Sequence, residues 1–123
     1  MTLSVKQLTA LVHMGITMTM VDGKVDDAEK AAILLELIHF GINSSDAEHI
    51  LAQAKNMDSA DVIVTLASMT EVQKKYCAAY LRVIMAADGN IDDSEIKLCA
   101  IVSALCGFPN MTIKEALDFW AAN

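Results

Sequence analysis

Carboxylate side chains are concentrated in two short segments that share one pattern. Residues 22–29 and 88–95 both read D-G-x-(I/V)-D-D-(small)-E, and they lie 66 positions apart. Together they hold eight of the sixteen Asp and Glu residues in the chain. Carboxylate oxygens are the ligands that the hard cations Ca²⁺, Mg²⁺ and Mn²⁺ prefer. The candidate metal ligands are Asp22, Asp26, Glu29, Asp88, Asp92 and Glu95.

A comparison with the EF-hand shows how complete each segment is. When Gly23 is aligned with the invariant glycine of the calcium loop, Asp26 takes the water-mediated position and Glu29 the bidentate position. The first two carboxylate positions of the loop fall on apolar residues in both copies, namely Met18, Met20, Ile84 and Ala86. Each segment therefore supplies about half a cation site, and we expect the two to meet in the folded chain.

Helix capping offers a second interpretation of the same carboxylates. Asp26 and Asp92 are suited to cap helices, and the acidic residues after them suit the positive end of a helix dipole. Asp22 and Asp88 are not explained in this way, because they follow the end of a helix, where the dipole disfavours an anion. Three interpretations stay open: capping alone, cation binding, and an acidic docking surface for a basic partner.

The similarity between the two segments extends along the chain. Residues 11–55 and 77–121 carry the same order of apolar stretches, and the 66-residue shift aligns Gly41 with Gly107 and Leu51 with Leu117. A length of 123 residues is typical of one domain. We therefore predict one domain over residues 1–123, built from two related halves with a pseudo-two-fold relation.

Helix-start signals occur throughout the chain, which has one Pro and five Gly. Capping residues precede apolar, helix-like spacing at Ser4, Asp26, Ser45, Asp58, Thr70, Asp92 and Thr112. They predict an all-α, compact bundle with helices at about 5–21, 27–40, 46–56, 59–68, 71–87, 93–106 and 113–121. The fourth of these contains a β-branched run that also suits an extended chain. The second and sixth are apolar on nearly all sides, so we expect them at the centre.

Composition narrows the classes of partner. The formal charge is −7 and the nine Lys and Arg residues are scattered, so neither nucleic acid nor an anionic membrane surface is an expected partner. The longest apolar stretch, residues 8–21, is too short to span a bilayer, and the N-terminus lacks the features of a signal peptide. We expect a cytoplasmic protein. The mean hydropathy of +0.40 predicts surplus apolar surface, covered by a weak homodimer or a protein partner.

No catalytic motif is present, and we predict that the chain is not an enzyme. It lacks a glycine-rich phosphate loop, a nucleophile elbow and an H-E-x-x-H sequence. The three cysteines lack metal-site spacing, which favours buried thiols in a reducing compartment. The three histidines are separated and are interpreted as structural; they are His13, His39 and His49.

The two acidic segments also resemble those of a known family. Val21-Asp22-Gly23…Glu29 and Ala87-Asp88-Gly89…Glu95 are similar to the repeated pattern of TerB-like tellurite-resistance proteins, apart from Val21, where the pattern prefers a small residue. The resemblance implies a compact bundle of about seven helices with its acidic residues on one surface. It also implies a role in metal binding and links to tellurite and other stress responses. The alternative is a non-catalytic interaction module that docks a partner through its apolar or acidic surface.

Overall fold

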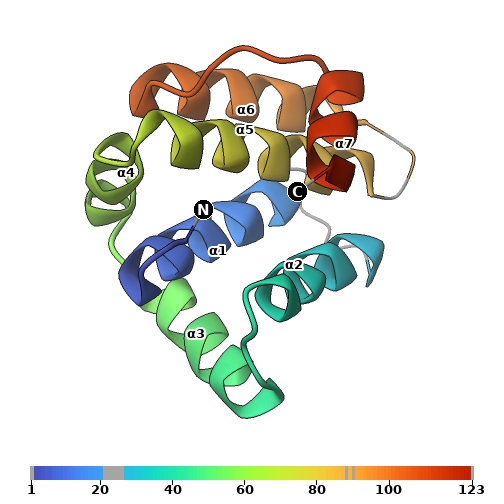
Figure 1. Cartoon of the computed structure of the whole chain (residues 1–123). Coiled ribbons are helices and arrows are strands. Elements are labelled where there is room, and N and C mark those ends of the chain that lie inside the picture. Colours follow the sequence, from blue (N-terminus) through green and yellow to red (C-terminus); the bar gives the residue numbers. More distant parts are fainter. Residues whose placement is uncertain (1, 21–26, 88, 90, 123) are drawn as a thin grey trace.

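The computed structural model describes residues 2–20, 27–87, 89 and 91–122, with the backbone alone for residues 27–30 (Figure 1). The predicted all-α fold is confirmed, because this part of the chain contains helices and no strand. Each helix begins and ends within two residues of the prediction, including the fourth, which is helical despite its β-branched run. The helices are α1 (Val5–Met20), α2 (Asp27–His39), α3 (Ser44–Asn56), α4 (Ser59–Ala67), α5 (Glu71–Ala86), α6 (Asp93–Cys106) and α7 (Ile113–Ala122).

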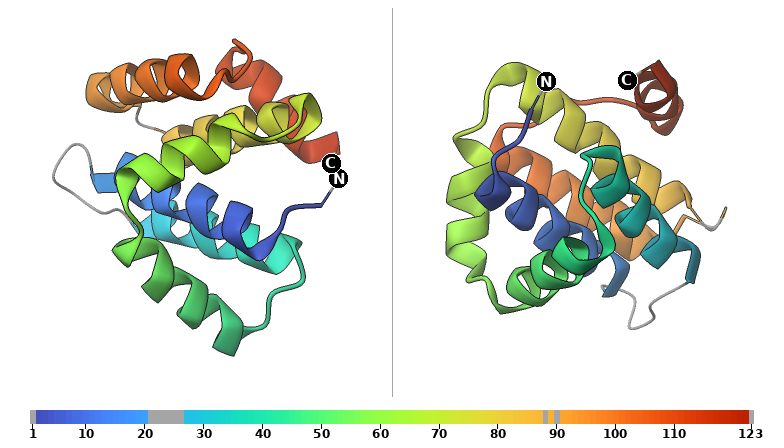
Figure 2. Two further views of the ribbon diagram at one scale, coloured as in Figure 1. Left: turned by 90° about the vertical axis from the view of Figure 1, so that its left-hand side faces the viewer. Right: turned by 60° about the horizontal axis from the view of Figure 1, so that its bottom comes forward.

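Helices α1 and α5 form the centre of the bundle. They run side by side, with α2 and α3 against α1 and with α6 and α7 against α5 (Figures 1 and 2). The expectation that the second and sixth helices are central was wrong. Leu35 and Ile38 of α2 are 63% and 64% exposed, and Ile101 and Leu105 of α6 are 57% and 59% exposed. An apolar composition on all sides did not distinguish a central helix from an outer helix with an uncovered face.

The two halves begin with the same hydrogen-bonded cap. Ser4 and Gln7 form a reciprocal capping box before α1, and Thr70 and Gln73 form the same box before α5, 66 positions later. Gln73 Nε2 also donates to Gln7 Oε1 at 3.3 Å. Equivalent residues of two halves touch each other only close to the axis that relates the halves. This contact therefore agrees with a pseudo-two-fold axis at the start of the two central helices.

The second helix of each half also ends in the same way. Gly41 and Gly107 follow α2 and α6 with φ of 76° and 70°, in the left-handed region that glycine adopts without a Cβ clash. In both halves the amide after the glycine donates to the carbonyl five residues earlier, at 3.1 Å and 2.9 Å. The order of the helices and the glycine structures at their ends are the same in both halves. That residues 11–55 superpose on residues 77–121 stays a prediction.

Most of the predicted caps that lie in the described residues are present. Thr112 and Glu115 form the expected reciprocal pair before α7, at 3.1 Å and 3.3 Å. The cap predicted at Ser45 was wrong, because Asn43 accepts instead from the Asp46 amide at 2.9 Å and α3 begins earlier. Asn is as good a cap as Ser, so the sequence alone did not separate the two. Asp58 occupies its predicted cap position without a side-chain bond.

A single glycine allows α1 and α5 to approach closely. A Cβ atom added at Gly15 would lie 2.9 Å from the Tyr80 hydroxyl oxygen and 3.0 Å from Ile84 Cδ1. Both of those side chains are fully buried, so they cannot move into solvent to make room. Gly15 therefore sets the spacing of the two central helices.

We expect Gly15→Ala to lower the free energy of unfolding by roughly 1–2 kcal/mol. Overpacking costs about 1–3 kcal/mol, and the better helix propensity of Ala offsets up to about 1 kcal/mol of that cost. Urea denaturation measures the change. Thr17→Ala, an exposed position on the same helix, is the control and should stay within about 0.5 kcal/mol of the wild type. Adding Tyr80→Phe should relieve part of the loss, because the approach to Ile84 Cδ1 remains. An equal loss in both backgrounds would contradict the predicted clash with the hydroxyl group.

Candidate functional site

The helix ends that flank the two acidic segments lie at one end of the bundle. Helices α1 and α5 run in the same direction and end at Met20 and Ala86, on the right in Figure 1. Helices α2 and α6 begin at that same end, at Asp27 and Asp93, and run back. Two helix N-termini, which carry partial positive charge, therefore point toward this end.

Only part of the predicted metal set can be located. Asp22, Asp26 and Asp88 lie outside the described residues, and Glu29 is described by its backbone alone. Whether the six ligands meet therefore stays a prediction. Within the described residues, no group of three or more His, Cys, Asp or Glu side chains could hold a metal ion.

The two described members of the set behave differently. Asp92 caps α6 and accepts a hydrogen bond from the Ser94 amide at 2.7 Å, and this bond lowers the pKa of Asp92. Glu95 lies in the first turn of α6 and is only 2% exposed. Capping explains Asp92 fully. It does not require the burial of Glu95, because a glutamate in a first helical turn can complement the dipole from the surface.

A second group of polar side chains, absent from the sequence interpretation, surrounds Glu36 of α2. Glu36 is fully buried and its Oε1 accepts a hydrogen bond from the Tyr76 hydroxyl of α5. Its Oε2 has no hydrogen-bond partner among the described residues, and neither does the buried hydroxyl of Tyr80. Burial raises the pKa of Glu36 to about 7, and the bond from Tyr76 only partly opposes that rise.

Aromatic rings pack around the tyrosine that bonds this carboxyl group. The Tyr76 ring lies 5.2 Å from Trp120 of α7 and 6.2 Å from His39 of α2, measured between ring centroids. Tyr80 stacks on Trp120 at 5.8 Å. We call Glu36, His39, Tyr76, Tyr80 and Trp120 the Glu36 cluster. It joins three helices, and its hydroxyl groups are held neutral because burial raises the pKa of both tyrosines.

The internal repeat gives a reason to regard Glu36 as functional. The position 66 residues later is Val102, which is 3% exposed in α6. The fold therefore accepts an aliphatic side chain at this place, and a buried carboxyl group is the more costly choice. The signal was present in the sequence as one charged residue inside the run Ile33-Leu34-Leu35-Glu36-Leu37-Ile38.

The remaining reactive side chains are dispersed. His13 Nδ1 donates to the Ala54 carbonyl at 2.6 Å and so joins α1 to α3. Burial raises the pKa of the three free thiols, which keeps them protonated; they are Cys77, Cys99 and Cys106. Their predicted burial is confirmed.

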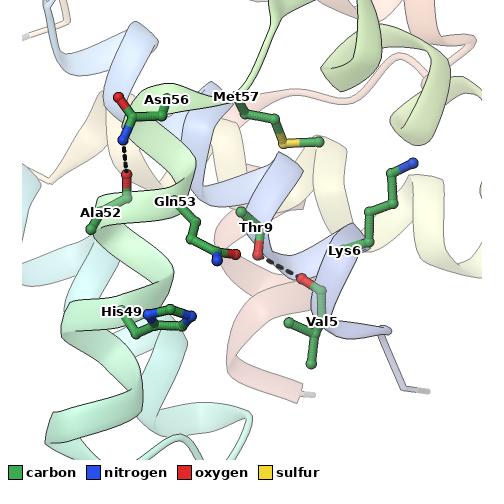
Figure 3. Close-up of a pocket in the computed structure, with 8 residues that line it drawn as sticks. All are labelled: Val5, Lys6, Thr9, His49, Ala52, Gln53, Asn56 and Met57. Carbon is green, nitrogen blue, oxygen red and sulfur yellow. Dashed lines mark hydrogen bonds between the residues drawn. The ribbon is translucent and has the colours of Figure 1, made fainter.

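Two surface hollows adjoin α1. The larger, of about 650 Å³, lies between the start of α1 and α3, at the opposite end of α1 from Met20 (Figure 3). Its wall is mixed, with Lys6 and His49 beside Val5 and Met57. The smaller, of about 260 Å³, is mainly apolar and lies between α1, α2 and α3. Neither hollow includes a predicted metal ligand among its lining residues. No helix in the described chain has the length and apolar character needed to cross a bilayer.

The fold defines a class: small single-domain all-α modules. The sequence profile of the family described as tellurite resistance protein TerB matches residues 8–118, and the chain belongs to this family. A crystal structure of a protein of unknown function from Porphyromonas gingivalis W83 is 40% identical, with a TM-score of 0.89. The match covers 100% of this chain and 99% of that one. No curated protein matches the chain.

The buried carboxyl group predicts a specific pH dependence of stability. Below its ordinary pKa of 4.5, Glu36 is protonated in both the folded and the unfolded chain. Between pH 4.5 and about 7 the unfolded chain loses this proton first, so the contribution of Glu36 to stability falls by about 3 kcal/mol and is constant above that range.

Glu36→Gln keeps the shape of the side chain, but the amide cannot ionise. The difference in unfolding free energy between the wild type and this variant should therefore shrink as pH falls from 8 to 4.5. Urea denaturation at several pH values measures it. A difference that does not vary with pH would show that Glu36 keeps an ordinary pKa.

Proposed function

We propose that this TerB-family protein is a non-catalytic acidic module that binds one divalent cation between its two D-G-x-(I/V)-D-D-x-E segments. Hard oxygen ligands favour Ca²⁺, Mg²⁺ or Mn²⁺ over metals that prefer thiolate or imidazole. The proposed ligands are Asp22, Asp26, Glu29, Asp88, Asp92 and Glu95.

The single observation that supports this proposal most strongly is the parallel course of α1 and α5. Both central helices end at the same end of the bundle, so the helix ends that border the two acidic segments all lie there. Carboxylates gathered at one end repel each other, and a cation relieves that repulsion. The burial of Glu95 adds a carboxylate directed inward rather than to solvent.

The biological setting follows from the family. Its description names tellurite resistance, and we place the protein in that response or in another stress response. We also propose a cytoplasmic location, because its three cysteines are free, buried thiols, as is usual in a reducing compartment.

Millimolar Ca²⁺, Mg²⁺ or Mn²⁺ should raise the melting temperature of the protein, and chelator should reverse the rise. A ligand that binds only the native state stabilises it by about 2.7 kcal/mol at a hundredfold excess over Kd. Asp22→Asn with Asp88→Asn should abolish this response. In metal-free buffer the same pair should be neutral or stabilising, because two anions leave unfavourable helix ends.

The matched control is Asp61→Asn with Asp118→Asn, which makes the same change in charge at two exposed positions away from both segments. It should keep the full metal response. A wild-type melting temperature that ignores both metal and chelator would end the proposal, as would an equal loss of response in the control.

An uncovered apolar stripe favours a second candidate function, self-association. Ala31, Leu34, Leu35 and Ile38 follow the i, i+3, i+4, i+7 spacing along the outer face of α2, and all four are exposed. We propose a second copy of this chain as the occupant. Two such stripes can pack antiparallel about a two-fold axis, and a charge of −7 disfavours contact between the copies through their polar faces.

Light scattering should detect dimers at high micromolar concentration, and Ile38→Glu should remove them. The added carboxylate would be desolvated at the centre of the contact, which is strongly unfavourable. Val64→Glu on α4, at a side chain that is 67% exposed against 64% for Ile38, makes the same chemical change elsewhere and should leave the dimer intact. A wild type that is monomeric at all concentrations contradicts the prediction.

A further inference from the structure

Helix α7 contributes Trp120 to the Glu36 cluster and is held chiefly by one neighbour. It packs mainly against α5, and it lies at the edge of the bundle in the right-hand view of Figure 2. Its contacts there include the stacking of Trp120 on Tyr80 and the approach of Lys75 Nζ to 4.9 Å from the centre of the Phe119 ring. Helices with few neighbours open at lower free energy than central ones.

The carboxyl group of Glu36 is connected to α7 through the ring of Tyr76. Glu36 accepts from the Tyr76 hydroxyl, and the Tyr76 ring packs on Trp120 with an interplanar angle of 31°. The titratable groups that face Glu36 from α5 are Tyr76, Tyr80 and Cys77, all of which burial keeps neutral. His39 stacks on Tyr76 from the same helix as Glu36. Besides burial, the influence on the pKa of Glu36 comes from the bond with Tyr76.

We propose that Glu36 is a proton switch that controls the docking of α7 on α5. Protonated, the carboxyl group is neutral and tolerates enclosure by the aromatic rings. Ionised, it has one oxygen bonded to Tyr76 and one without a protein partner, and the charged form needs water. Loosening the stack of Tyr76 and Trp120 admits that water and undocks α7.

The expected size of the effect is large enough to measure. Desolvation raises the pKa of Glu36 from 4.5 to about 7 in the closed arrangement. If opening restores an ordinary environment, ionisation favours the open arrangement by as much as about 300-fold. The change falls between pH 4.5 and about 7 and does not require a bound metal, so it can be tested in chelator whether or not the proposed cation site exists.

Trp120 is the only tryptophan of the chain, so its fluorescence reports on α7 alone. Acrylamide quenching of the full chain in chelator, from pH 4.5 to 8.5, should rise with pH, with a midpoint between the open-state pKa of 4.5 and the closed-state pKa of about 7. Glu36→Gln should hold quenching at the low-pH level throughout. Glu36→Val, which places the repeat's own residue at this position, should do the same and serves if the Gln variant does not fold.

His39 is the competing explanation, because its ring lies 6.1 Å from that of Trp120. His39→Gln should therefore keep the transition. The proposal is overturned if the wild type shows no transition, if the transition persists in Glu36→Gln or Glu36→Val, or if His39→Gln removes it.

Discussion

The parallel packing of α1 against α5 is the constraint on which the rest of the structure depends. Gln7 and Gln73 meet where the two helices begin, and Gly15 lets them stay close further along. Both run in one direction, and α2 and α6, which follow them, both run back from the same end of the bundle. The helix ends that border the two acidic segments therefore lie at one end of the bundle. An antiparallel pair would have placed them at opposite ends.

The Glu36 cluster is built from residues that differ between the two halves of the sequence. Where the second half has Tyr76, Tyr80 and Trp120, the first half has Ala10, Met14 and Ala54, all smaller. The second half thus supplies the rings, and the first half supplies the carboxyl group at the position where the second half has Val102. A strictly symmetric bundle would have no such cluster, so this polar site is a product of asymmetry within a repeated fold.

The sequence predicted what local interactions determine. Helix bounds follow from caps and from apolar spacing, and these act over a few residues, as the boxes at Ser4 and Thr70 show. The sequence did not predict which helices are central, because α2 and α6 are apolar on all sides and only packing shows which side is covered. It also did not predict that Glu36 is enclosed, since that enclosure needs rings 40 and 84 positions away, from Tyr76 and Trp120.

Helix α2 connects the two proposed sites. It begins beside the first acidic segment and carries Glu36 about 14 Å further along its axis. A cation that fixes the start of α2 and a proton that fixes its contact with α5 both act on one rigid element. Thermodynamic linkage makes any such coupling reciprocal: if binding a cation favours the docked helix, then cation must also raise the pH at which Trp120 becomes accessible. If the two sites are independent, metal should leave the midpoint of the Trp120 transition unchanged. Comparing the midpoint measured in chelator with that measured in metal therefore distinguishes coupled sites from separate ones.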